Sequence, residues 1–259
     1  MKLGLQLGYW GAQPPQGVGE LVAAAEESGF DAIFTAEAWG SDAFTPLAWW
    51  GRETSRIKLG TSIVQMSGRT PTSIAMHLMT LDHLSGGRVS LGVGFGWNTD
   101  ELNDHNVPPA RRRTMLREYL EAMRALWTQE EAEYDGEFVK FGPSWAWPKP
   151  VQAHIPVLVG AAGTEKNFKW IAKSADGWIT TPRDFDIDAP VKLLQDTWAA
   201  ADRDGAPQIV ALDFKPDPDK LARWAELGVT EVLFGLPDKP EAEVGAYVER
   251  LAGKLAALV

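Results

Sequence analysis

The sequence contains no cysteine, and histidine is scarce, with four residues at positions 77, 83, 105 and 154. The absence of cysteine excludes disulfides, thiolate nucleophiles and metal sites built on thiolates. The histidines do not follow a metal-binding spacing such as H-E-x-x-H, so no metal site is predicted. The motifs of a nucleophilic serine and of a phosphate-binding P-loop are missing too. Redox chemistry would therefore need a bound cofactor.

Basic residues and long apolar runs are also in short supply. Lys and Arg number 25 against 35 Asp and Glu, which gives a net charge of -10. A nucleic-acid-binding protein needs a basic surface, so nucleic acid is not an expected partner. No apolar run approaches ~18 residues, so no membrane span is expected. The first strand-like segment begins at residue 2 and leaves no room for a signal peptide, so we expect a cytoplasmic protein.

Strand-like and helix-like segments alternate along most of the chain. Strands are expected at residues 1–8, 31–36, 57–64, 88–94, 157–160, 177–180, 209–214 and 229–234, and helices at 18–29, 42–52, 70–84, 112–127, 164–174, 189–202, 218–227 and 241–258. Eight such units predict an α/β fold, a (β/α)8 TIM barrel, in which residues 1–259 form a single domain. A doubly wound open sheet is the alternative, but the turn Gly8–Gly11 is not a dinucleotide-binding fingerprint.

The alternation is interrupted after the fourth strand. Residues 95–111 are rich in Gly, Asn, Asp and Pro and predict a long loop. Residues 134–141 predict a short hairpin around the turn Asp135-Gly136. Residues 143–156 contain four prolines and predict an extended connector. The barrel is therefore expected to carry an insertion after strand 4.

In a (β/α)8 barrel the active site lies at the carboxyl ends of the strands, so the residues there are candidates for ligand binding. Trp10, Trp39 and Trp97 follow three different strands. Indoles at loop tips suit a planar ligand, and the alternative is that they pack against one another at the rim. The predicted cofactor-binding residues at the strand ends are Gln6, Trp39, Ser62, Ile63, Gly96, Trp97, Asn98, Gly160, Ala161, Ala162, Gly163, Thr164, Thr180 and Thr181.

The turn Gly160–Thr164 joins a strand to a helix. Small residues allow a ligand to approach the backbone, and the first N–H groups of the helix lack internal partners, so the turn suits a phosphate. The alternative is a plain tight turn in which Thr164 caps the helix. The basic run Arg111–Arg113 predicts a solvated helix start, with a role in binding an acidic cofactor tail as the alternative.

Several motifs resemble those of the bacterial-luciferase-like superfamily. They are Gly60-Thr-Ser-Ile-Val64, Arg69-Thr-Pro71, Thr80-Leu-Asp-His-Leu-Ser-Gly-Gly-Arg88, Leu91-Gly-Val-Gly-Phe-Gly-Trp-Asn98, Pro148-Lys-Pro-Val151, Ile155-Pro-Val-Leu-Val-Gly160 and Ala175-Asp-Gly-Trp178. The likeness covers about residues 1–182 and is greatest to oxidoreductases that use the deazaflavin coenzyme F420. The part before Gly87 is similar to one subgroup and the part from Gly94 to another, as in a mosaic or chimera of the two.

The resemblance implies a (β/α)8 barrel that transfers hydride between coenzyme F420 and a small organic substrate. It implies a cis peptide at Ser62–Ile63 that bulges against the central ring, with Gly96 and Trp97 flanking that ring. It places the phosphate at Ala161–Thr164, near Thr180 and Thr181. Relatives are commonly homodimers through helices two and three. The acidic tail of F420 would need a local basic patch, for which Arg69, Lys166 and Arg183 are candidates.

The chain departs from the family at the end of the second strand. Some relatives have Asp-His there, with the histidine as catalytic acid or base, whereas this chain has Glu37-Ala38. Glu37, and after it His105, are therefore the predicted catalytic proton donors. Two alternatives stay open: an FMN-dependent luciferase-like monooxygenase, and a flavin-binding barrel without catalysis.

Overall fold

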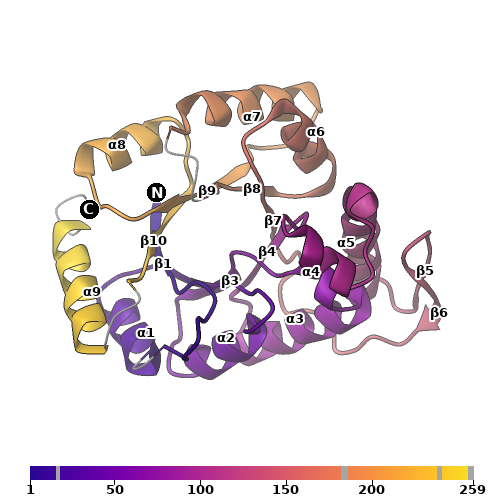
Figure 1. Cartoon of the computed structure of the whole chain (residues 1–259), viewed down its shortest axis with the longest axis horizontal. Helices are drawn as coiled ribbons and strands as arrows, with labels where there is room; N and C mark the ends of the chain where they lie inside the picture. Colours follow the sequence, from indigo (N-terminus) through magenta and orange to yellow (C-terminus); the bar gives the residue numbers. More distant parts are fainter. Residues whose placement is uncertain (16–17, 182–185, 238–240, 256–259) are drawn as a thin grey trace.

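The computed structural model describes residues 1–15, 18–181, 186–237 and 241–255 (Figure 1). Eight parallel strands close into a barrel in the order β1-β10-β9-β8-β7-β4-β3-β2. Their bounds are β1 Lys2–Gln6, β2 Ala32–Thr35, β3 Lys58–Thr61, β4 Val89–Gly94, β7 Val157–Gly160, β8 Gly177–Ile179, β9 Gln208–Asp213 and β10 Glu231–Gly235. The closed parallel barrel confirms the predicted (β/α)8 fold and excludes the open sheet.

A helix follows each barrel strand and covers the outside of the ring, as Figure 1 shows. The bounds of these helices are α1 Val18–Glu27, α2 Phe44–Gly51, α3 Pro71–Ser85, α5 Arg112–Thr128, α6 Glu165–Ser174, α7 Asp188–Ala200, α8 Pro218–Glu226 and α9 Glu241–Leu255. The predicted end of the last helix, residues 256–258, lies outside the described residues. None of the helices in the described parts of the chain is long and apolar enough to cross a membrane.

Capping residues explain where several helices begin and end. The hydroxyl of Thr70 accepts a hydrogen bond from a backbone N–H of the first turn of α3, and Pro71 fits the first helical position, where no N–H donor is needed. Gly86 ends the same helix with a left-handed φ of 67°, which glycine adopts without steric strain. The side chain of Asp217 caps α8 in the same way as Thr70, ahead of Pro218.

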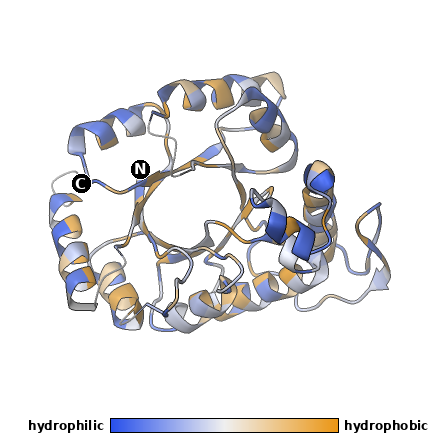
Figure 2. Cartoon of the chain, in the orientation of Figure 1, coloured by the Kyte–Doolittle hydropathy of each residue, from blue (hydrophilic) through white to orange (hydrophobic). Residues whose placement is uncertain are grey.

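The apolar core has two layers. Figure 2 shows apolar residues both on the barrel strands and on the helices around them. The outer layer fills the space between strands and helices, where apolar helix faces turn toward the barrel. The inner layer lies within the barrel and is built from Ala32, Phe34, Leu158, Ile179, Val210 and Leu233. It closes the interior, because these side chains are at most 1% exposed. Ligands are therefore confined to the open ends of the barrel.

The predicted insertion after β4 is present, but its first part is not a plain loop. Residues 99–104 form the short helix α4 (Thr99–Asp104), and the 3-10 helix η2 (Pro109–Arg111) precedes α5. The Oδ1 atom of Asn98 accepts hydrogen bonds from the N–H groups of Asp100 and Glu101, which starts α4 despite the loop-like composition. The predicted hairpin is confirmed as β5 (Ala132–Asp135) and β6 (Lys140–Ser144), so the connector begins later than expected.

Candidate active site at the barrel mouth

The segment after β3 leaves the barrel wall and bulges at the mouth. The peptide bond between Ser62 and Ile63 is cis, as predicted. The N–H of Ser62 donates to the carbonyl of Thr35 at 2.6 Å, and the carbonyl of Ile63 accepts from the N–H of Glu37 at 3.1 Å. Val64 then returns to pair with β4. The bulge is thus fastened to the end of β2, and the predicted strand 57–64 ends as a regular strand at residue 61.

The Ile63 side chain lies over the ends of β4 and β7. A Cβ atom on Gly94 would stand 2.1 Å from Cδ1 of Ile63, and one on Gly160 would stand 2.8 Å from its Cγ2. A side chain at either position would force Ile63 to move, because real Cβ atoms do not approach other atoms this closely. The glycine at 160 therefore serves the bulge as well as the turn that follows it. Ile63 forms an apolar platform at the mouth.

Gln6 and Ser62 hydrogen-bond to each other beside this platform. Nε2 of Gln6, at the end of β1, donates to the carbonyl of Ser62 at 3.3 Å and to its hydroxyl at 3.2 Å. Ser62 is 8% exposed. Both residues were predicted to bind the cofactor, and the structure brings them together beside Ile63; direct contact with a ligand stays a prediction.

The loop after β4 places an aromatic residue at the same end of the barrel. Gly96 has a φ of 77°, and a Cβ there would stand 2.8 Å from Leu102, so this turn requires glycine. Trp97 follows and is 82% exposed, while Asn98 is engaged in capping α4. Trp97 is available to a ligand from the mouth, whereas the carboxamide oxygen of Asn98 is used inside the protein.

The loops after β1 and β2 touch each other. The N–H of Trp10 donates to the hydroxyl of Ser41 at 2.9 Å, and Ser41 pairs with Ala38 in an isolated bridge. Trp39 lies within this bridge and is 57% exposed. Trp10 is half-buried against the core. The indole of Trp10 therefore packs at the rim, and that of Trp39 stays accessible.

The turn after β7 leads into the amino terminus of α6. Thr164 caps that helix by accepting from the N–H of Asn167 at 3.4 Å, as one of the two interpretations predicted. The N–H groups of Ala162 and Gly163 donate no hydrogen bond to any described residue. Together with the free N–H groups of the first turn of α6, they form a site suited to an anion. Ala161 is tied to β8 through its own N–H, at 3.4 Å from the Ile179 carbonyl.

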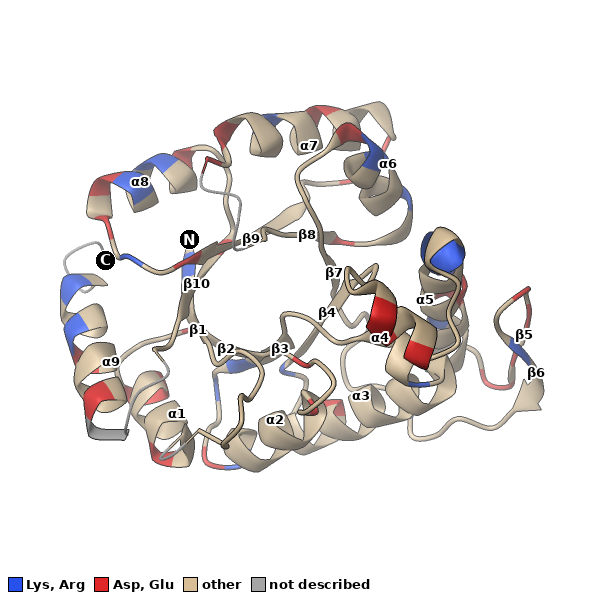
Figure 3. Ribbon diagram, in the orientation of Figure 1, with Lys and Arg blue, Asp and Glu red and all other residues tan. Residues whose placement is uncertain are grey.

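Arg113, on α5, reaches the same turn. Its guanidinium donates to Oδ1 of Asn167 at 2.5 Å and lies 4.2 Å from the ring centroid of Phe95. Burial lowers the pKa of Arg113, and the neighbouring charge of Arg112 adds to this shift. The chain thus places a cation beside the anion-binding turn; Figure 3 shows the basic end of α5 near α4. A role of Arg111–Arg113 in binding an acidic cofactor tail stays a prediction.

The two threonines after β8 differ in their surroundings. Thr180 is 2% exposed, and its hydroxyl accepts from the N–H of Leu212 at 2.8 Å, so it is used in the barrel wall. Thr181 is half-buried and follows at the strand end. Contact of either residue with a phosphate stays a prediction. Arg183, a candidate for the basic patch, lies outside the described residues.

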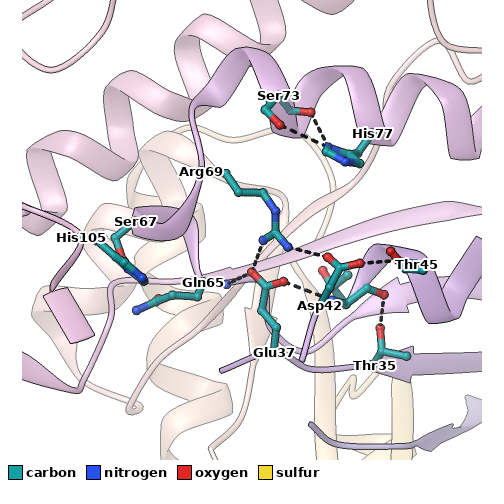
Figure 4. A network of polar contacts seen from close by, with 12 residues as sticks. Thr35, Glu37, Asp42, Thr45, Gln65, Ser67, Arg69, Ser73, His77 and His105 are labelled. Atoms are coloured by element: carbon teal, nitrogen blue, oxygen red, sulfur yellow. Dashed lines mark hydrogen bonds and ion pairs between the residues drawn. The ribbon is translucent and has the colours of Figure 1, made fainter. Parts of the chain in front are cut away.

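Glu37 lies at the centre of a polar network (Figure 4). Its Oε1 accepts from the N–H of Gln65 at 2.7 Å and from Nη1 of Arg69 at 2.6 Å, and its Oε2 accepts from the N–H of Ala43 at 3.1 Å. The side chain is 3% exposed. Because both oxygens are engaged, the geometry favours a positioning role for Glu37. Its assignment as proton donor stays a prediction.

Arg69 is held between two carboxylates. Nη2 donates to Oδ1 of Asp42 at 2.5 Å while Nη1 binds Glu37. Burial raises the pKa of Asp42, but hydrogen bonds from Thr45 and the charge of Arg69 outweigh it, so the net pKa lies below its usual value. The expectation that Arg69 belongs to a patch for an acidic tail is therefore not supported, since two carboxylates already compensate its charge. Lys166 is exposed on α6.

Glu101, on α4, and His105, which follows that helix, face the same network. Nδ1 of His105 lies 2.9 Å from the hydroxyl of Ser67, and its Nε2 has no hydrogen-bond partner among the described residues. Glu101 is 6% exposed, and its Oε1 has no partner there either. Burial raises the pKa of Glu101, against the opposing charge of His105. A buried carboxyl with a raised pKa is a common feature of functional sites.

The sequence did not predict that Arg113 contacts the turn before α6, nor that Glu101 belongs to the site. The position of Glu101 follows Asn98 by three residues, which is a capping pattern that predicts a helix start. That signal would have revealed α4, but not the burial of its glutamate. The described residues contain no group of three or more His, Asp or Glu side chains that could hold a metal ion.

Comparisons with known proteins agree with this geometry. A model of the luciferase-like monooxygenase family matches residues 4–227. The chain is 79% identical over 206 residues to the uncharacterised Mycobacterium tuberculosis protein Rv0953c, which covers 80% of this chain and 73% of the relative. It is 30% identical over 282 residues to the F420-dependent glucose-6-phosphate dehydrogenase of Segniliparus rotundus, which covers 95% of this chain and 81% of that enzyme.

Solved structures share the fold. The monooxygenase RslO1 from Streptomyces bottropensis superimposes with a TM-score of 0.86 at 21% identity over 99% of both chains. The coenzyme F420 dependent tetrahydromethanopterin reductase from Methanopyrus kandleri gives a TM-score of 0.77 at 20% identity, over 100% of this chain and 99% of that one. At these identities the similarity establishes the barrel and leaves the chemistry to the site.

Proposed function

Because the chain belongs to the luciferase-like monooxygenase family, we propose that it is a coenzyme F420-dependent oxidoreductase that transfers a hydride between the deazaflavin and a small organic substrate. One observation carries the proposal: the Ile63 platform and the free N–H groups of the α6 turn lie at the same barrel mouth. A flat ring and a phosphate on one ligand need these two features together.

The residues of the mouth fit such a group. Ile63 offers an apolar surface for the ring, and Trp97 lies on the adjoining loop. Ala162 and Gly163 offer unpaired N–H donors for the phosphate, and Arg113 adds a positive charge beside them. Coenzyme F420, when bound, supplies the hydride chemistry, which the side chains present do not provide.

The protein's part is to hold the reactants and to move a proton. In this proposal Glu37 and Gln6 fix the Ser62–Ile63 bulge from two sides. His105 supplies or takes the proton through Nε2, because its Nδ1 is already bound to Ser67. An imidazole nitrogen suits this task because it can both accept and donate a proton. Exchange of His105 for Gln should lower turnover while the affinity for cofactor stays unchanged.

Cofactor titration tests the proposal. Purified protein is titrated with coenzyme F420 and with FMN at low and high salt, with the ligand's own fluorescence as the readout. We expect micromolar binding of F420 that weakens with salt, and much weaker binding of FMN. Arg113→Ala should weaken F420 binding by roughly tenfold, as expected for loss of a charged hydrogen-bond donor. Arg117→Ala, on the same helix but half-exposed and paired with Glu121, is the matched control.

Other outcomes would point to the alternatives. Tighter binding of FMN without salt dependence would replace this proposal with an FMN-dependent monooxygenase. Binding of F420 without turnover on a broad substrate panel would leave a flavin-binding barrel without catalysis.

We also propose a homodimer through α2 and α3. Trp49 on α2 is 73% exposed, and Met76 and Leu84 on α3 are 58% and 74% exposed. Large apolar side chains that remain exposed on neighbouring helices support a protein interface. Sedimentation of the purified chain as a monomer at micromolar concentration would refute it.

A further inference from the structure

Phe214 is a second apolar side chain at the barrel mouth. It follows β9, which lies across the barrel from β3, the strand that leads to Ile63. Leu233 belongs to the inner layer of the barrel, so Gly235, two residues further along β10, also faces inward. A Cβ on Gly235 would stand 2.4 Å from the Phe214 ring. The ring of Phe214, which follows β9, therefore lies over the inward side of β10. It remains 55% exposed, so the mouth side of the ring is accessible.

Further aromatic residues extend the same side of the rim. The barrel order places β9, β10, β1 and β2 next to one another, and the N–H of Leu236 after β10 donates to the carbonyl of Gln6 on β1 at 3.0 Å. Tyr9 follows β1 and is 62% exposed, and Trp39 follows β2 and is 57% exposed. We call Tyr9, Trp39 and Phe214 the aromatic arc. The anion-binding turn after β7 lies outside this arc, two strands beyond β9.

The charge beside the arc disfavours an anionic ligand. Glu37 and Asp42 together bind one cation, Arg69, which leaves one negative charge uncompensated. Asp42 is one-third exposed, so its charge reaches the solvent at the rim. Lys215 follows Phe214 and is exposed. Among the described residues, its ammonium group beside the arc is the one that could attract an anionic ligand.

We propose that the aromatic arc is the substrate wall and that the substrate is an uncharged, flat, apolar molecule such as an aromatic or conjugated carbonyl compound, not a sugar phosphate. The inference rests on the proposed function. In the reducing direction a C–H bond of the reduced deazaflavin would break as its hydride passes to the carbonyl carbon, and the carbonyl oxygen would gain a proton from the protein. The C=O π bond is lost, C–H and O–H bonds form, and the products are an alcohol and the oxidised cofactor.

Three probes separate shape from charge. Cinnamaldehyde is flat and uncharged, cinnamate has the same ring with a carboxylate, and glucose 6-phosphate is an anionic sugar. Their binding is measured by calorimetry on the F420-loaded protein and on the cofactor-free protein. We expect cinnamaldehyde to bind roughly tenfold more tightly than cinnamate, and Phe214→Ala to weaken it by a further factor of roughly ten, since an aromatic contact contributes about that much. Trp145→Ala, an exposed aromatic residue far along the chain from the arc, is the control and should change nothing.

The outcomes are distinguishable. Tighter binding of glucose 6-phosphate than of cinnamaldehyde, lost in Lys215→Ala, would overturn the inference, as would cinnamaldehyde binding that Phe214→Ala leaves unchanged. Failure of F420 to bind would refute the proposed function alone, because the titration of cofactor-free protein still decides what the arc binds. Retention of F420 affinity in Phe214→Ala to within about twofold would show that the variant is folded and that the arc serves the substrate.

Discussion

Replacing Glu37 with Gln is expected to destabilise the barrel mouth. The carboxylate accepts from three donors, namely the N–H groups of Ala43 and Gln65 and Nη1 of Arg69, at 3.1, 2.7 and 2.6 Å. A glutamine has a single acceptor oxygen, and its NH2 group is itself a donor. In either orientation the amide therefore leaves at least one buried donor without an acceptor and sets two donors against each other.

The magnitude follows from these contacts. One buried hydrogen-bonding group left unsatisfied costs about 1–3 kcal/mol. Breaking a buried ion pair by removing one partner costs about 3–5 kcal/mol, but Asp42 still compensates Arg69 here, so the lower end applies. We expect the free energy of unfolding to fall by about 3 kcal/mol. For a chain of this size that lowers Tm by about 6–12 °C.

Thermal unfolding followed by circular dichroism gives Tm, and F420 fluorescence gives cofactor affinity. Because the Glu37 carboxylate also accepts from the N–H of Gln65, two residues after Ile63, we expect Glu37→Gln to weaken F420 binding as well as stability. Asp42→Asn is the matched control, since Asp42 contacts the same guanidinium but is one-third exposed; its cost should stay below about 1 kcal/mol. If Glu37→Gln keeps the wild-type Tm and affinity but loses turnover, the positioning argument fails and Glu37 is the proton donor.

The fold was predictable because its signals are local. The alternation of strands and helices, the pair Thr70-Pro71 before α3 and Gly86 after it are each visible within a few residues. Helix α4 escaped because Asn98 acts as a cap within a segment whose composition is typical of a loop. Composition describes a whole window, whereas one cap decides where a helix begins.

The site was predictable only in part. The cis bond at Ser62–Ile63 was inferred from a motif and is confirmed. The contact of Arg113 with Asn167 joins positions 54 residues apart. The contact of Phe214 with Gly235 joins two different strand ends. No periodicity or spacing marks such contacts in a single sequence, since they arise only when the barrel closes and brings distant loops to one rim.

The remaining predictions concern stability. Burial raises the pKa of Glu26, but N–H donors of residues 55–57 outweigh it and hold the pKa at about 2, below the usual 4.5. Glu26→Gln should therefore lose about 2 kcal/mol at neutral pH after allowance for solvent screening, a difference that vanishes in urea titrations as the pH falls from 4.5 to about 2. Gly94→Val should displace Ile63, whose Cδ1 lies 2.1 Å from the added Cβ, and abolish F420 binding in a fluorescence titration. Burial raises the pKa of Glu101, against the opposing charge of His105, so the folded state favours its neutral form. The stability that this provides is complete below the unfolded pKa and is lost as the pH rises through the folded one. Glu101→Gln is always neutral, so it should gain stability relative to the wild type as the pH rises above 4.5 in urea unfolding, and parallel pH curves for the two proteins would contradict the burial of this carboxyl.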